Sequence, residues 1–173
     1  MSKTEENLKA AFAGESQARN KYTYFAGQAR KEGYHYIARI FEETAENERR
    51  HAKDEFKLLG GIGDTAANLK AAWGGEDYEV QTMYKEFAEI AEEEGNTDAA
   101  VLFSQIRKVE THHRDRYKKL LEMVENGTVF KRDQPIKWKC GVCGYVYEGT
   151  EPPAKCPCCK HPREYYEPAN LDF

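Results

Sequence analysis

The chain alternates long stretches of helical pattern with short glycine breaks. Between the breaks, alanine, leucine and aromatic residues recur every three to four positions among glutamate and lysine, which is typical of amphipathic helices. Residues 3–126 contain no proline. The pattern predicts four helices, at about 3–32, 34–59, 75–94 and 97–126.

The residues at the breaks predict how these helices begin and end. Glycines such as Gly33 and Gly95 stand just past a helix end, where a left-handed backbone is expected. Ser2 with Glu5 predicts a capping box, and Asn96 or Thr97 is expected to cap the last helix. The turns after the first and third helices are short, so each pair predicts an antiparallel hairpin. The longer 60–74 stretch is expected to be a crossover between the hairpins.

The two predicted hairpins are related in sequence. Residues 22–51, shifted by 62 positions, align without a gap on residues 84–113, and ten of the thirty positions are identical. Such self-similarity indicates a duplicated helical hairpin. The identical pairs are Tyr22/Tyr84, Phe25/Phe87, Ala26/Ala88, Ala29/Ala91, Glu32/Glu94, Gly33/Gly95, Ala38/Ala100, Phe41/Phe103, Glu48/Glu110 and His51/His113.

The amino-acid composition of the chain changes after Gly127. The last forty residues hold all six prolines and all five cysteines. A piece this small needs a metal or disulfides to be stable. We therefore expect an all-α region at 1–127, a linker at 128–137 and a small β-rich, metal-stapled module at 138–173.

Composition and charge narrow the class of protein. A chain of 173 residues that is 32% charged and 40% hydrophobic is typical of a soluble globular protein. The net charge is −4 and there is no basic block, which argues against nucleic acid or an anionic membrane as a partner. No apolar run is long enough to span a bilayer, and the first residues lack a signal core. We expect a cytoplasmic protein.

A glutamate three residues before a histidine occurs in both hairpins, as Glu48 with His51 and Glu110 with His113. Residues three apart on a helix share a face. One copy alone would be unremarkable on a solvated face, but two copies at matching positions of a duplication indicate a metal site. His112 is one position off that face, so we expect it at the surface or behind the ligands.

The remaining ligands are expected on the first and third helices. Glu15 lies on an otherwise apolar stripe, where an ionised carboxylate is costly unless it is paired or metal-bound. A shift of 62 from Glu15 reaches position 77, which Glu76 and Glu79 flank. One glutamate from each of two helices plus Glu-x-x-His from each of the others is the pattern of a ferritin-like four-helix bundle with a di-iron or di-manganese centre.

Two tyrosines fall on the same side as these ligands. Tyr22 and Tyr84 are symmetry mates in the duplication. They are expected either to pack in the core or to donate hydrogen bonds to ligand carboxylates from behind the metal site.

The cysteines form two Cys-x-x-Cys pairs separated by twelve residues. This spacing predicts a closed tetrahedral metal site, without choosing between zinc and iron. Pairing Cys156 with Cys159 repeats the spacing of Cys140 with Cys143, so Cys158 is expected to be a spare thiol. The predicted ligands are Cys140, Cys143, Cys156 and Cys159.

Taken together, the chain resembles the rubrerythrin family over essentially its whole length. The motifs that carry the resemblance are AFAGESQAR, ENERRHA, GGEDYE, KVETHH and CGVCGYVYEG with CPCCKHP. The resemblance implies a non-haem di-iron centre in the bundle and a mononuclear Fe(Cys)₄ centre in the module. It also implies reduction of hydrogen peroxide to water in defence against oxidative stress. Implied partners are a rubredoxin or an NAD(P)H-dependent reductase as electron donor, and a second copy of the chain in a homodimer.

The resemblance also assigns roles to single residues. Glu48 and Glu110 match bridging carboxylates, Glu15 matches a terminal ligand of the first iron, and Glu76 and His113 match terminal ligands of the second. Within the family, the first iron moves between the histidine matching His51 and the extra glutamate matching Glu79. Two rival functions stay open: a ferroxidase that handles iron, and a protein whose metals are structural, with zinc in the cysteine module.

Overall fold

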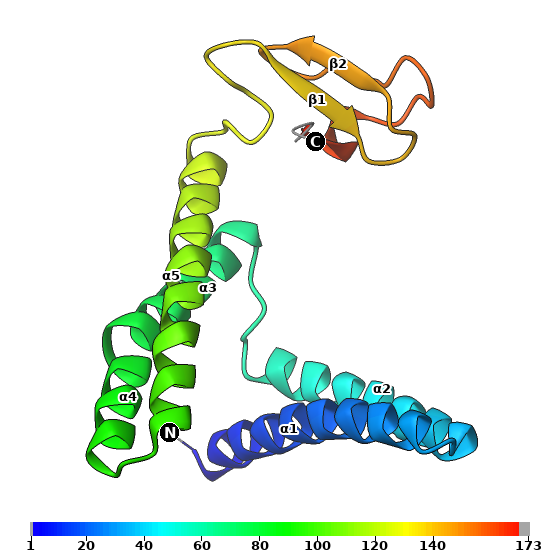
Figure 1. The fold of residues 1–173 in the computed structure, drawn as a ribbon. Helices are drawn as coiled ribbons and strands as arrows, with labels where there is room; N and C mark the ends of the chain where they lie inside the picture. The colour runs from blue at the N-terminus through cyan, green and yellow to red at the C-terminus, as the bar shows by residue number, and fades with distance from the viewer. Residues whose placement is uncertain (1, 170–173) are drawn as a thin grey trace. The chain divides into compact units, whose positions relative to one another are not determined.

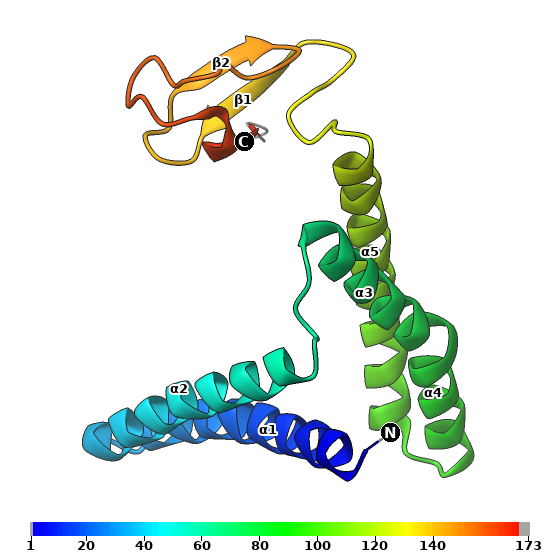
Figure 2. The same ribbon diagram turned by 180° about the vertical axis from the view of Figure 1, so that it is seen from behind.

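The computed structural model describes residues 2–169, beginning with an antiparallel helical hairpin. Helices α1 (Lys3–Lys31) and α2 (His35–Leu58) run side by side along their length (Figures 1 and 2). The Ser2 hydroxyl accepts a hydrogen bond from the Glu5 backbone N–H at 3.2 Å, and Gly33 has a φ of 86° at the turn. The predicted start and end of this first helix are therefore confirmed.

Small side chains hold the first hairpin together. The buried residues on α1 and α2 are all alanines: Ala26, Ala29, Ala38, Ala45 and Ala52. Their small volume lets the two backbones approach closely, and the larger Phe41 packs against the same cluster. An ion pair between Arg30 and Glu42 also joins the two helices.

The second hairpin begins ten residues earlier than the sequence pattern predicts. Helix α3 covers Thr65–Tyr78, and Asp64 caps it by accepting a hydrogen bond from the Ala67 N–H at 2.8 Å. The prediction of a crossover loop through 60–74 was wrong because Gly74 and Gly75 were taken as a break. They lie inside the helix, where the preceding alanine-rich sequence favours helix and outweighs their cost.

After α3 the backbone passes through a π-helical turn, η1 (Glu79–Met83), and continues as α4 (Tyr84–Glu93). Helix α5 (Thr97–Glu125) returns alongside α4, as Figures 1 and 2 show. The Asn96 side chain caps α5 by accepting from the Ala99 N–H at 3.2 Å. The predicted second hairpin is confirmed, with the added π turn that the pattern did not predict.

The C-terminal module is a small antiparallel sheet. Strands β1 (Ile136–Cys140), β2 (Val146–Gly149) and β3 (Tyr166–Pro168) lie in the order β2-β1-β3, and a 3₁₀ turn, η2 (Arg163–Tyr165), precedes β3. Trp138 on the central strand is fully buried and donates its indole N–H to the Gly149 carbonyl at 2.9 Å. The fold class is thus as expected: an all-α region followed by a small β-rich module.

The chain divides into two compact units, residues 1–63 and residues 64–173. The first contains the α1–α2 hairpin, and the second contains the α3–α5 hairpin and the β-rich module. Among the described residues, no helix is both long and apolar enough to cross a membrane.

Candidate metal centres

The first hairpin brings together three of the predicted ligands. Glu48 and His51 are three residues apart on α2 and so share a face, and Glu15 approaches them from α1. Nδ1 of His51 lies 2.9 Å from Oε2 of Glu48 and 3.9 Å from Oε2 of Glu15. One ligand atom from each residue lies within 4.8 Å of the others, which is close enough for all three to bind one ion.

The second hairpin repeats this arrangement. Glu110 and His113 share a face of α5, and Glu76 approaches from α3. Nδ1 of His113 lies 2.6 Å from Oε2 of Glu110 and 3.8 Å from Oε2 of Glu76. These three residues also offer ligand atoms within 4.8 Å of one another.

The aromatic residues behind the two ligand groups are duplicated as well. In the first hairpin the Tyr22 ring lies 6.3 Å from Phe25 and 6.1 Å from Phe41. The corresponding rings in the second hairpin, Tyr84 with Phe87 and Phe103, are 6.4 Å and 6.1 Å apart. The duplication seen in the sequence is therefore a duplication of side-chain packing.

The helices that carry Glu15 and Glu76 differ by one residue. Seven positions lead from Glu15 to Tyr22, whereas eight lead from Glu76 to Tyr84. At 100° per residue, an uninterrupted α-helix would place two residues eight positions apart roughly 80° from a common face. The π turn η1 lies within this interval and absorbs the extra residue. Ligand and aromatic groups can therefore keep the same arrangement in both hairpins.

Glu79 is the first residue of this π turn and stands beside the second group rather than within it. Burial raises the pKa of its carboxyl first, and the charge of Glu110 raises it further. Burial is also the main cause of the raised pKa of Glu76, and a hydrogen bond with Glu110 raises it further. Both effects mean that negative charge is crowded here, and a divalent cation would relieve the crowding.

Carboxylates are crowded in the first hairpin as well, where a further glutamate, Glu55, lies near the ligand group. A shared hydrogen bond with Glu48 is the main cause of the raised pKa of Glu15, and the charge of Glu55 adds to it. Glu55 Oε2 is buried and has no hydrogen-bond partner among the described residues. The sequence reading missed Glu55, although its position four residues after His51 places it on the ligand face of α2.

The two tyrosines stand in different surroundings. Burial raises the pKa of the Tyr84 hydroxyl, and the charges of Glu79, Glu110 and Glu76 raise it further, which places this hydroxyl near the second ligand group. Tyr22 makes ring contacts with Phe25 and Phe41. His112 is exposed on α5, as expected of a residue off the ligand face.

The cysteine module brings four thiols together. Sγ of Cys140 lies 3.7 Å from Sγ of Cys159, and Sγ of Cys143 lies 3.7 Å from Sγ of Cys156. A tetrahedron with metal–sulfur bonds of about 2.3 Å has sulfur–sulfur edges of about 3.8 Å. The four sulfurs are thus spaced for one tetrahedral ion, and the exposed Cys158 lies outside the group.

Two equivalent turns present these cysteines. The Gly144 N–H donates to the Cys140 carbonyl at 2.8 Å, and the Lys160 N–H donates to the Cys156 carbonyl at 3.0 Å. Gly144 and Lys160 have φ values of 77° and 65°. Burial alone would raise the pKa of Cys156, but hydrogen bonds, first among them one from the Cys159 backbone, lower it to about 6. The second turn therefore stabilises the thiolate form of Cys156, whereas the neighbouring thiols contribute to raising the pKa of Cys143.

Comparisons with known proteins agree with this geometry. Residues 6–121 match the family model described as rubrerythrin, and residues 138–167 match the rubrerythrin rubredoxin-like domain. A rubrerythrin of Porphyromonas gingivalis is 49% identical, covering 99% of this chain and 92% of that protein. A rubrerythrin of Nitratidesulfovibrio vulgaris is 47% identical, covering 99% of this chain and 97% of that protein. Nigerythrin of the same organism is 37% identical, covering 94% of this chain and 85% of that protein.

Proposed function

Because the chain belongs to the rubrerythrin family, we propose that it is a non-haem di-iron peroxidase that reduces hydrogen peroxide to water. The observation that carries this proposal is the combination of sites in one chain. Two groups of carboxylates with an imidazole suit a reactive metal centre, and a closed four-cysteine site suits electron delivery to it.

The residues present fit the metals that the family carries. In the first hairpin a hydrogen bond with Glu48 is the main cause of the raised pKa of Glu15, and in the second hairpin burial and then Glu110 raise the pKa of Glu76. Bound cations would relieve this crowding of negative charge. Oxygen donors with one imidazole per group suit iron better than a structural zinc. The residues proposed to hold the di-iron centre are Glu15, Glu48, His51, Glu76, Glu79, Glu110 and His113.

The reaction consumes two electrons and two protons for each peroxide, which leaves as two molecules of water. The di-iron centre, when bound, supplies the two electrons that cleave the O–O bond. Glu79 stands beside the second ligand group, and its carboxylate would serve as the additional ligand that neutralises positive charge on the di-iron centre. The nearby Tyr84 hydroxyl is placed to orient a ligand carboxylate by donating a hydrogen bond.

The cysteine module is proposed to return electrons. Four thiolates occupy all the coordination positions of a tetrahedral ion, so this site has no open position for substrate and is suited to one-electron transfer. Cys143 is exposed and the neighbouring Val142 side chain is 46% exposed, which gives a donor an apolar approach to the site. The donor proposed is a rubredoxin or an NAD(P)H-dependent reductase, and the assembly proposed is a homodimer in the cytoplasm.

An anaerobic reaction tests the proposal directly. The fully reduced protein is mixed with one equivalent of hydrogen peroxide, and the visible spectrum is followed by stopped flow. We expect fast oxidation of the di-iron centre, followed by return of the Fe(Cys)₄ colour as the module supplies electrons. Slow reaction with peroxide would contradict the proposal.

The same preparation distinguishes the rival functions. A ferroxidase would react quickly with dioxygen in the presence of added Fe(II) and would retain several irons per chain. A protein with structural zinc would be colourless as isolated. We expect a red protein that dithionite bleaches and that retains no more iron than its two sites require.

A further inference from the structure

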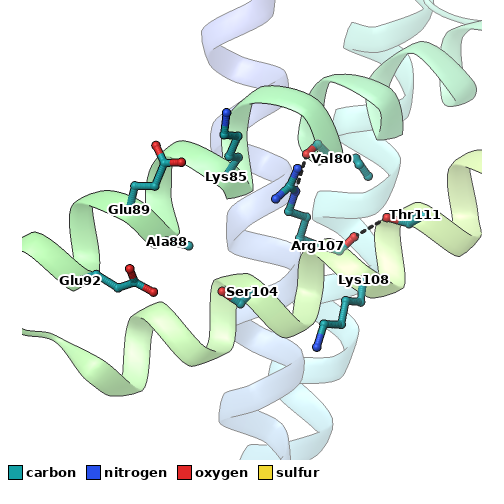
Figure 3. Close-up of a pocket in the computed structure, with 9 residues that line it drawn as sticks. All are labelled: Val80, Lys85, Ala88, Glu89, Glu92, Ser104, Arg107, Lys108 and Thr111. Atoms are coloured by element: carbon teal, nitrogen blue, oxygen red, sulfur yellow. Dashed lines mark hydrogen bonds between the residues drawn. The ribbon is translucent and has the colours of Figure 1, made fainter.

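The π turn η1 has a side-chain partner on the opposite helix. Nε of Arg107, on α5, donates to the Val80 backbone carbonyl at 2.6 Å, and Figure 3 shows the guanidinium reaching across from α5 to this carbonyl. A π turn shifts the helical hydrogen-bond pattern by one residue, which leaves a carbonyl in need of another donor. Arg107 supplies a charged donor to that region.

The backbone of Arg107 also accepts a hydrogen bond from a side chain on the same helix. Thr111, one turn further along α5, donates its hydroxyl to the Arg107 carbonyl at 2.9 Å (Figure 3). The Arg107 side chain is partly buried and lies at an open pocket of about 470 Å³ lined by η1, α4 and α5. Enclosure by protein strengthens a charged hydrogen bond relative to one at an open surface.

The first hairpin provides a comparison within the same molecule. Position 107 corresponds to Ala45, which is buried and has no donor in its side chain. Helix α1 runs from Lys3 to Lys31 without a π turn. The inserted residue, the π turn and the arginine occur together in the second hairpin, and none of the three occurs in the first.

The turn decides which way the ligands of α3 face. Without it, Glu76 and Tyr84 would lie roughly 80° apart around the helix rather than on one face. Glu79, as the first residue of the turn, would be reoriented by the same change. A group that stabilises the π turn therefore also controls whether these carboxylates reach Glu110 and His113.

We propose that Arg107 is a positioning residue that holds the π turn and so keeps Glu76 and Glu79 directed at Glu110 and His113. The guanidinium acts through the Val80 carbonyl and does not touch substrate or metal. The inference rests on the proposed function only in treating these carboxylates as metal ligands. The conformational part of it stands on the hydrogen bond and the comparison between hairpins.

A matched pair of substitutions tests this role in the full-length protein. Arg107→Met keeps the aliphatic length and removes the donor, whereas Arg107→Lys keeps a cationic donor. Hydrogen exchange of the backbone amides from 79 to 86 is measured with the di-iron site emptied by a chelator. We expect faster exchange in Arg107→Met and partial rescue in Arg107→Lys. Unchanged exchange in Arg107→Met would overturn the proposal.

Metal binding gives a second measurement that does not depend on turnover. Mn²⁺ is titrated into the same emptied proteins, and the free ion is followed by electron paramagnetic resonance. We expect Arg107→Met to lower the affinity by about 10-fold, as loss of groups behind metal ligands generally does, with Arg107→Lys between it and the wild type. Equal affinities in all three proteins would also overturn the proposal.

A second variant, which removes the extra residue of the π turn, tests the role of the turn if Arg107→Met does not fold. Deleting the exposed Gln81 together with Arg107→Ala gives the second hairpin the spacing and side chain of the first. We expect this variant to keep its helical circular dichroism and slow exchange at 79–86, while its Mn²⁺ affinity falls through misplacement of Glu79. Wild-type Mn²⁺ affinity here would contradict the role of the turn. Failure of the peroxidase assay alone would affect only the proposed function.

Discussion

Lys160 holds the same left-handed backbone conformation in the second cysteine turn that Gly144 holds in the first. The φ values are 65° and 77°, and both N–H groups donate to the carbonyl of a cysteine four residues before. Glycine adopts this conformation freely, whereas a residue with a Cβ is strained in it. The module therefore carries strain in one of its two metal-binding turns.

Lys160→Gly is expected to stabilise the module by about 1 kcal/mol, because it removes this strain while keeping the backbone hydrogen bonds. The Lys160 side chain donates to the Pro157 carbonyl at 2.7 Å, but this contact is exposed and contributes little. Thermal bleaching of the Fe(Cys)₄ absorption measures the effect. Gly144→Ala is the control and should lower the midpoint, and a lower midpoint for Lys160→Gly would contradict the prediction.

The two neighbouring cysteines of the second turn are expected to behave differently. Cys158→Ser should leave the Fe(Cys)₄ spectrum intact, since Cys158 is exposed and outside the thiol group. Cys159→Ser should abolish that spectrum, since its sulfur lies 3.7 Å from that of Cys140. Iron content and visible absorption of the purified variants measure the difference. Equal loss in both variants would mean that Cys158 takes part in binding.

Glu79→Ala is expected to slow peroxide turnover by at least about 10-fold while the protein stays folded. The substitution removes a carboxyl that stands beside Glu110 and whose pKa is raised by burial, while alanine keeps the helical propensity of the position. Steady-state peroxide reduction measures the effect, with the iron content checked for each variant. Glu86→Ala, at an exposed position on α4, is the matched control and should retain full activity.

The metal-free protein is expected to lose stability as the pH rises. Burial raises the pKa values of Glu76 and Glu79 above the ordinary value of 4.5, so the folded chain binds more protons than the unfolded chain. The stability that these raised pKa values contribute is fully present below pH 4.5 and is lost as the pH rises through the raised values. Thermal midpoints of the emptied protein at about pH 5 and about pH 7.5 test this.

The control for this pH dependence is the double variant Glu76→Gln with Glu79→Gln. Its two amides do not titrate, so its midpoint should change less between the two pH values than that of the parent protein. An equal change in both proteins would assign the pH dependence to other groups.

Most of the helices and the grouping of the candidate ligands could be predicted because their signals are local. Helical periodicity and glycines such as Gly33 and Gly95 placed three of the four helices, and the duplicated Glu-x-x-His spacing brought out both histidines. The start of α3 was missed because Gly74 and Gly75 are locally indistinguishable from a break. The helix tolerates these two glycines because Asp64 caps it and alanines lie between Asp64 and Gly74.

Other features depend on contacts that no local pattern contains. The hydrogen bond from Arg107 to Val80 joins residues 27 positions apart and requires α5 to lie against η1. The one-residue difference in spacing between Glu15–Tyr22 and Glu76–Tyr84 is visible in the sequence, but whether a loop, a kink or a π turn absorbs it is decided by packing. The crowding of Glu55 against Glu15 likewise appears only when α1 and α2 are in contact.

Two faithful copies of one ancestral hairpin would offer the same ligands twice and would bind two equivalent ions. A difference of one residue between the copies is enough to break that equivalence, because the π turn confines the disturbance to Glu79–Met83 and leaves the rest of the hairpin in register. Selection could then act on one half of the duplication without harming the other. Chemical asymmetry between the halves can thus arise from a single small mutation, with no need for a gradual divergence of the whole fold.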